Sequence, residues 1–160
     1  MKKFTSIILL SICFLSLSAC GFVKGKGEAE KVAESLFNER LQNGWSGTNK
    51  YYSELFWKNT SEKKWTNIQN LVSKAMGGLK SFSLTTWNVQ SKVHTNEISG
   101  TIVRLVYETE YENGKGTETL TLHKPLMGKE FSILGHNINS ELIQQLIEKG
   151  IEQAASADGT

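Results

Sequence analysis

The sequence has few of the residues and motifs that catalytic and metal sites usually need. It contains two cysteines and three histidines, and His94, His123 and His136 are too far apart to form a metal-binding motif. It has no Gly-x-Ser-x-Gly motif and no metalloprotease helix, and Gly25-Lys26-Gly27 is too short to cradle a phosphate. These absences argue against hydrolase and nucleotide chemistry and leave an unfamiliar enzyme open. We expect no cofactor and no metal.

The N-terminus carries the features of a secretory signal. Lys2-Lys3 precede an apolar run from Ile7 to Leu17, which is shorter than the roughly 20 residues that a membrane-spanning helix needs. The segment ends in Leu17-Ser18-Ala19-Cys20, which resembles the lipobox of bacterial lipoproteins. The resemblance implies a diacylglycerol thioether on Cys20, cleavage just before it, and a membrane-anchored place in the cell envelope. The alternatives are an ordinary signal peptide cut after Ala19 and an uncleaved anchor.

The residue after the proposed lipid site indicates to which membrane the lipoprotein is sorted. Gly21 follows Cys20 where a retention signal would have aspartate, which resembles sorting to the outer membrane if the host has two membranes. Residues 1–19 are then the signal peptide, 20–27 a lipidated tether, 28–153 one folded domain and 154–160 a flexible tail. Two or three acyl chains would hold the protein firmly, since each buried methylene contributes about 0.8 kcal/mol.

Net charge is also lacking once the signal is removed. The formal charge of +2 includes Lys2 and Lys3, so residues 20–160 carry equal numbers of basic and acidic side chains. A neutral domain has no electrostatic basis for binding nucleic acid. With Cys13 removed and Cys20 acylated, the domain has no disulfide and must be stabilised by packing alone.

Three helices are predicted first. Apolar residues at helical spacing predict a helix from about Glu28 to Gln42, including Leu36, Phe37 and Leu41 on its buried side. A short aromatic helix over Lys50 to Lys58 follows. Asn59 and Glu62 are expected to cap a third helix that ends at Gly77-Gly78.

Four strands and a last helix are predicted next. Leu79 to Val93 changes its apolar phase near Thr85-Thr86, which indicates a β-bulge. Glu97 to Glu112, Thr117 to Lys124 and Glu130 to Ile138 follow, with a hairpin at Asn113-Gly114. Asn139 or Ser140 should cap the final helix, whose apolar stripe comprises Leu142, Ile143, Leu146, Ile147 and Ile151.

The predicted fold class is α+β, with N-terminal helices packed in a curved antiparallel sheet of about four strands and an extra C-terminal helix. Three stretches resemble the nuclear-transport-factor-two-like (cystatin-like) cone, in particular its uncharacterised bacterial envelope domains: the aromatic segment 51–57, the hairpin and strand 114–122, and the last strand 131–138. The resemblance implies a cone that often holds a pocket. It does not imply one function, since function varies widely in this superfamily.

Candidate pocket residues lie near the end of the last strand. His136 and Asn137 are expected at the rim of the cone, and His136 is the one acid–base candidate because histidine titrates near neutral pH. Tyr107 is expected in the core or pocket wall. Glu108, Glu110 and Glu112 share one strand face and should be solvated, since three like charges repel when buried.

The aromatic and apolar side chains suggest binding surfaces. The four tryptophans are expected to be structural, with a ligand pocket or partner surface as the alternative. Docking on the outside of the sheet is the simpler expectation for the last helix. Its residues Leu142, Ile143, Leu146 and Ile147 are the candidate interaction surface if the stripe instead contacts a partner.

The sequence therefore favours a non-enzymatic, lipid-anchored binding module of the envelope. Its expected partners are the membrane, through acylated Cys20, and an envelope protein or a small apolar ligand. A homodimer through the sheet face is also open. The alternatives are a small cone-pocket enzyme, such as an isomerase or dehydratase, and a purely structural oligomerising module.

Overall fold

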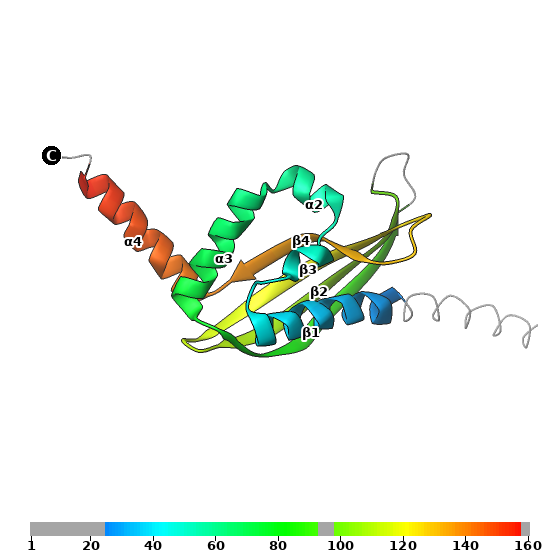
Figure 1. Cartoon of the computed structure of the whole chain (residues 1–160), viewed down its shortest axis with the longest axis horizontal. Helices are drawn as coiled ribbons and strands as arrows, with labels where there is room; N and C mark the ends of the chain where they lie inside the picture. The colour runs from blue at the N-terminus through cyan, green and yellow to red at the C-terminus, as the bar shows by residue number, and fades with distance from the viewer. Residues whose placement is uncertain (1–24, 93–97, 158–160) are drawn as a thin grey trace, which may run out of the picture.

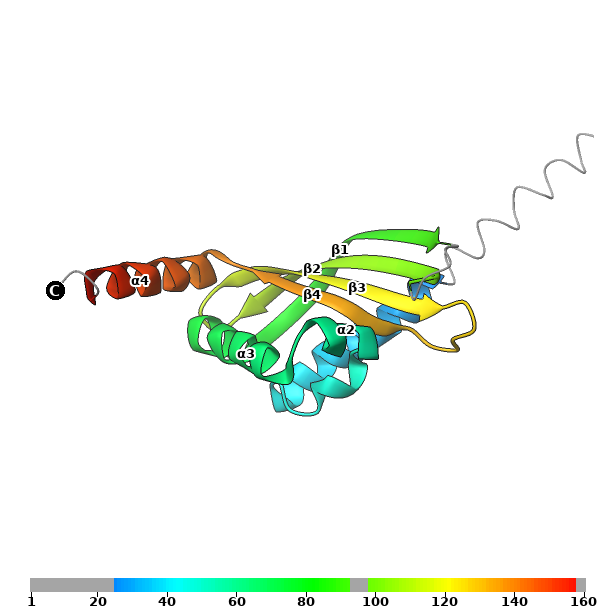
Figure 2. The same cartoon turned by 90° about the horizontal axis from the view of Figure 1, so that it is seen from above.

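The computed structural model describes residues 25–92 and 98–157. Its helices and strands follow one another along the chain as a helix over residues 25–43, a 3₁₀ turn η1 (Thr48–Tyr51), α2 (Glu54–Asn59), α3 (Glu62–Met76), β1 (Leu79–Lys92), β2 (Gly100–Tyr111), β3 (Lys115–Pro125), β4 (Ser132–Asn139) and α4 (Glu141–Ala157). Helices 25–43, α2 and α3 lie on one side of the curved sheet, and α4 extends away from the body (Figure 1; Figure 2). The predicted α+β fold is confirmed.

The first helix follows the predicted apolar pattern with two differences. Residues 25–27 are already helical, although the sequence assigned them to the tether. Leu41, predicted to face the core, is exposed, and Arg40 is buried in its place. The buried side of the helix consists of Ala29, Ala33, Leu36, Phe37 and Arg40, which are spaced by three or four residues.

The start of α3 differs from the predicted capping pair. Asn59 is the last residue of α2, and the N-cap of α3 is Ser61, whose hydroxyl accepts a hydrogen bond from the amide of Lys64. Serine competes well with asparagine at this position, since both place a side-chain oxygen over the free amides of the first turn. The predicted end at Gly77 is confirmed; it has a φ of 76°, and its amide bonds to the Ser73 carbonyl.

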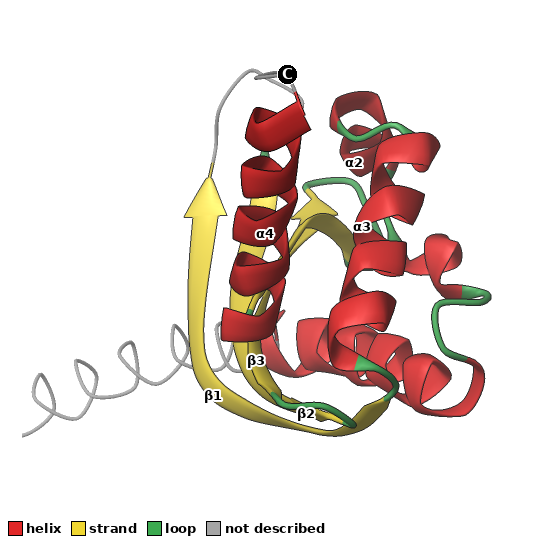
Figure 3. Ribbon diagram, turned by 90° about the vertical axis from the view of Figure 1, so that its left-hand side faces the viewer, coloured by secondary structure: helices red, strands yellow, loops and turns green. Residues whose placement is uncertain are grey.

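The sheet is a meander in the order β1-β2-β3-β4, with every neighbour antiparallel. The predicted bulge is present, because the register with β2 shifts between Leu84 and Thr86. Leu84 therefore lies opposite Tyr107, and Trp87 lies opposite Leu105, so both apolar phases of β1 face the same side. β1 and β2 bend strongly and partly enclose the helices (Figure 3).

The core fills the concave side of the sheet. The main cluster joins the first helix, α2 and α3 to inward residues of β2, β3 and β4, among them Phe37, Trp65, Leu105, Leu120 and Ile133. Phe37 stacks on Phe82 with ring centroids 4.7 Å apart, which holds the helix against β1. Full burial of each large apolar side chain contributes about 1.5–3 kcal/mol.

Helix α4 does not dock on the outside of the sheet. Ser140 caps it, as predicted, by accepting a hydrogen bond from the amide of Ile143. Ile143 is buried in a small cluster with Val72, Met76 and Tyr111, and the helix then continues past α3 and away from the cone (Figure 1; Figure 2). It is helical to Ala157, so it includes part of the predicted flexible tail. Within the described ranges, no helix is both long enough and apolar enough to cross a membrane.

A buried polar cluster as candidate functional site

Two charged residues, one in the first helix and one in β3, lie on the face of their element where the neighbouring residues are apolar and buried. Arg40 continues the buried side of the first helix, three residues after Phe37. Glu118 shares the inward face of β3 with Leu120 and Leu122 and has no exposed surface. A buried charge needs a partner, and these two residues are partners of each other.

Arg40 and Glu118 form the centre of a cluster of five polar side chains, which we call the cone cluster: Arg40, Tyr52, Tyr111, Glu118 and His136. Nη1 of Arg40 lies 2.6 Å from Oε2 of Glu118, and Nη2 lies 2.6 Å from the hydroxyl of Tyr111. The Tyr111 hydroxyl also donates to Oε1 of Glu118. The carboxylate therefore accepts hydrogen bonds on both oxygens.

The histidine extends the cone cluster toward α2. Nε2 of His136 lies 2.7 Å from Oε2 of Glu118, and Nδ1 lies 2.8 Å from the hydroxyl of Tyr52. The guanidinium of Arg40 covers the ring of Trp45, with Cζ 3.8 Å from the ring centroid. Polar side chains thus connect the first helix, β2, β3 and β4. Tyr52, which directly follows η1, adds the fifth side chain.

The protonation states follow from these contacts. Burial raises the pKa of Glu118, but the charge of Arg40 and the hydrogen bond from His136 outweigh burial and bring the pKa to about 2. Burial lowers the pKa of His136, although Glu118 partly opposes this. The ring is therefore neutral at pH 7, donates from Nε2 to the carboxylate and accepts at Nδ1 from Tyr52. Burial also raises the pKa of Tyr52, so its hydroxyl stays protonated.

Access to the cone cluster is restricted. The side chains of Glu118 and His136 have no exposed surface, and Tyr52 is 6% exposed. A pocket of about 230 Å³ is lined by Arg40, Trp45 and Tyr111 but by neither Glu118 nor His136. A solute in that pocket could meet the cation and the Tyr111 ring, yet it would not reach the one base of the cluster.

The predicted pocket residues do not form a rim. The side chain of His136 is inside the core, and only its backbone borders a shallow depression on the outer face of the sheet. Asn137 is exposed on that outer face. Tyr107 is in the core, as predicted, and its hydroxyl does not join the cone cluster. His136 and Asn137 are separated because the side chains of adjacent residues in a strand point to opposite faces of the sheet.

The other candidates are distributed as follows. Cys20 and His94 lie outside the described residues. His123 is buried, with Nε2 3.2 Å from the carbonyl oxygen of Ser99, in agreement with a hydrogen-bonded structural histidine. Glu108, Glu110 and Glu112 are exposed, as predicted.

The tryptophans are mainly structural. Trp65 is in the core, and Trp45 covers Arg40. Trp57 is half-buried beside Phe56, while Trp87 is 47% exposed. On α4, Ile143 is buried, Leu142 and Leu146 are half-buried, and Ile147 is 46% exposed.

Arg40 and Glu118 were missed by the sequence analysis, although a signal was present. Each is a charge in the apolar phase of its element, and the two charges are opposite. No set of three potential metal ligands is grouped among the described residues. Comparison with protein-family models, curated proteins and solved structures found no match to this chain.

Proposed function

We propose that this protein is a lipid-anchored module of the bacterial envelope, with a cone of the nuclear-transport-factor-two-like superfamily, that binds a protein partner through α4 and catalyses no reaction. The lipobox-like sequence before Cys20 supports the anchor, and the helices followed by a bent antiparallel sheet support the superfamily. The observation that carries the binding function is the partly exposed apolar stripe of α4, which lies outside the core. The polar side chains of the cone cluster, by contrast, already have hydrogen-bond partners among themselves.

The closed interior disfavours an enzyme or a small apolar ligand inside the cone. A general base must come within about 3 Å of its substrate, directly or through one water. Nδ1 and Nε2 of His136 both already have hydrogen-bond partners, and both are buried. A substrate would have to displace Tyr52 and the aromatic rings packed around it, including Trp65.

The stripe on α4 fits a helix-in-groove interaction. Ile143 fixes the start of the helix on α3, whereas Ile147, one turn later, is exposed. Among the described side chains of α4, Glu141 and Glu148 outnumber Lys149. The partner expected from this chemistry is a protein with an apolar groove and a basic margin.

The anchor is tested by intact mass and fractionation of the full-length chain expressed in a bacterial host. We expect the wild-type product to begin at Cys20 and to carry acyl mass in the membrane fraction. Cys20→Ala should give a soluble or unprocessed protein. An unmodified Cys20 in the wild type would refute the anchor.

The partner surface is tested by photo-crosslinking in cells. A photo-reactive amino acid would replace Gln144 in one variant and Gln145 in a matched control. Both positions are exposed, but at 100° per residue Gln144 lies about 60° from Ile147 around the helix, and Gln145 about 160°. We expect a discrete adduct from position 144 and none from position 145. Equal results at the two positions would contradict binding through the side of α4 on which Ile147 is exposed, and an adduct of two copies of this chain would favour the oligomerising module instead.

A further inference from the structure

The turn between β3 and β4 exposes the most prominent apolar side chains among the described residues. Leu126 is 63% exposed and Met127 is 96% exposed, at the tip of the turn that follows Pro125. The turn itself is ordered by a hydrogen bond from the amide of Gly128 to the carbonyl of Pro125. Such a pair needs an explanation, because methionine is seldom left fully in water.

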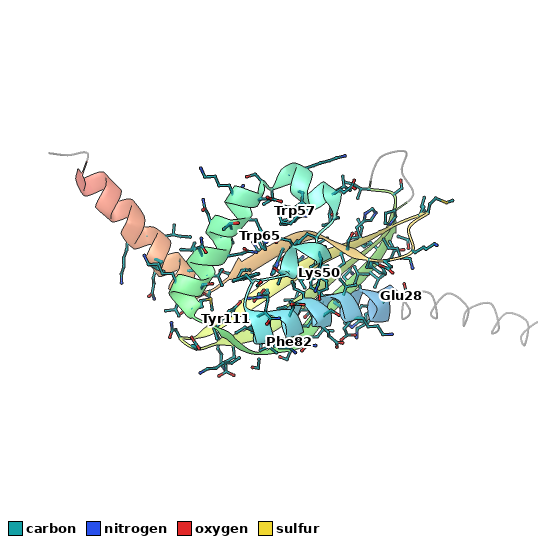
Figure 4. The ribbon with its side chains drawn as sticks, in the orientation of Figure 1. Glu28, Lys50, Trp57, Trp65, Phe82 and Tyr111 are labelled. Carbon is teal, nitrogen blue, oxygen red and sulfur yellow. The ribbon has the colours of Figure 1, made fainter. Side chains whose placement is uncertain are left out.

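The same end of the molecule is where the chain leads back toward Cys20. A Cβ at Gly25 would lie 3.7 Å from Cγ2 of Thr101, near the start of β2. Nζ of Lys124 lies 2.8 Å from Oε2 of Glu28, so the first helix begins beside the base of the turn. The labelled Glu28 marks this end in Figure 4, with Tyr111 toward the other end of the cone.

The distance to the proposed lipid site is short. Gly25 is five residues after Cys20, and an extended chain of that length covers only about 17 Å. If Cys20 carries acyl chains in the bilayer, the end of the cone near Gly25 stays within that distance of the lipid. α4 is then held at the opposite end, away from the membrane (Figure 1; Figure 2).

We propose that Leu126 and Met127 insert into the membrane surface as a second contact beside the lipidated Cys20, which orients the cone with α4 pointing away from the bilayer. This inference rests on the anchoring part of the proposed function. The occupant of the surface is the acyl region of the bilayer and not the charged headgroups. The two exposed charges that follow the turn, Lys129 and Glu130, cancel, and Lys124 is paired with Glu28. The contact should therefore be insensitive to salt.

The test uses the full-length, processed lipoprotein in vesicles of phosphatidylethanolamine and phosphatidylglycerol. Met127→Cys introduces a thiol to which a nitroxide spin label can be attached, because Cys20 is acylated and Cys13 is removed with the signal. Gln145→Cys, on exposed α4, is the matched control. Vesicle flotation is measured first, and the accessibility of each label to oxygen and to a water-soluble nickel chelate is measured second.

We expect the label at 127 to be accessible to oxygen and protected from nickel, at both low and high salt, while the label at 145 shows the reverse. A protein that floats but has equal nickel accessibility at both positions would overturn the second contact and leave the anchor intact. A protein that does not float would refute the anchor, and the orientation with it. A label at 127 protected from both reagents would show contact with protein instead of lipid and would also overturn the proposal.

Discussion

Nη1 of Arg40 and Oε2 of Glu118 lie 2.6 Å apart, although 78 positions separate the two residues in the chain. The contact connects the first helix to the third strand inside the cone. Neither side chain has appreciable exposure, so neither charge is solvated by bulk water. The pair can persist only because Tyr111 and His136 supply further hydrogen bonds to the carboxylate.

Removing the carboxylate charge should destabilise the fold strongly. Glu118→Gln leaves the Arg40 guanidinium buried without its counter-charge, and we expect a loss of about 3–5 kcal/mol in the free energy of unfolding. Urea denaturation measures the loss. Glu108→Gln, on the exposed face of β2, is the matched control and should change the stability by less than about 0.5 kcal/mol. A loss below about 1 kcal/mol for Glu118→Gln would show that the pair contributes little.

The hydroxyl of Tyr52 should matter although it lies at the edge of the cone cluster. Tyr52→Phe leaves Nδ1 of His136 buried without a donor, and we expect a loss of about 1–3 kcal/mol. Tyr107→Phe is the control, because the Tyr107 hydroxyl is not hydrogen-bonded in this structure. Equal losses from the two variants would argue against the Tyr52–His136 hydrogen bond.

Stability should fall steadily with acid. The pKa of His136 in the folded protein is below its ordinary value of 6.5, so the unfolded chain binds more protons just below that pH, and the free energy of unfolding decreases as the pH falls. Glu118 also lowers the free energy of unfolding as the pH falls, between about pH 5 and pH 2. The decrease is on the order of 3 kcal/mol for a pKa lowered from 4.5 to about 2. Urea titrations from pH 8 to pH 3 test this dependence.

His136→Gln separates the two contributions to the acid dependence. In this variant the decrease in the free energy of unfolding that begins near pH 6.5 should disappear. Most of the decrease below pH 5 should remain, because the charge of Arg40 lowers the pKa of Glu118 more than His136 does. A variant that retains the full decrease near pH 6.5 would show that another group is responsible.

The base of the apolar turn depends on a glycine. Gly100 has a φ of 139°, and an added Cβ would lie 2.1 Å from the carbonyl oxygen of Lys124. Gly100→Ala should therefore destabilise the protein by at least about 1–3 kcal/mol. Gly135→Ala is the control, since its Cβ would lie 3.7 Å from Thr121, an ordinary contact. Thermal unfolding of the two variants should differ clearly, and equal melting temperatures would contradict the strain at Gly100.

Much of the fold could be predicted because the spacing of apolar residues, and the residues that cap or end an element, are local features of the sequence. The phase change at Thr85-Thr86 indicated the bulge, and Gly77 indicated the end of α3. The direction of α4 could not be predicted in this way, because an apolar stripe does not reveal which surface covers it. Ile143 packs beside α3 and not on the outer face of the sheet.

The cone cluster could be predicted only in part. The titration range of histidine makes His136 a candidate from the sequence. Whether its side chain points into the core depends on the pairing register of β4, which shifts against β3 near Leu122. Arg40 and Glu118 each break an apolar pattern, and a single broken pattern is usually an exposed charge. Only the folded structure shows that Arg40 and Glu118 contact each other.

We propose that the protein acts through its outer surface and not through its interior. The most direct measurement is the yield of the crosslinked adduct from position 144 in two backgrounds, Ile147→Asp and Tyr52→Phe, at equal amounts of folded protein in the membrane fraction. Ile147→Asp places a charge in the exposed stripe, whereas Tyr52→Phe changes only the cone cluster. We expect the adduct to disappear in Ile147→Asp and to persist in Tyr52→Phe. An adduct that survives Ile147→Asp and is lost in Tyr52→Phe would show that binding depends on the interior of the cone and not on the stripe of α4.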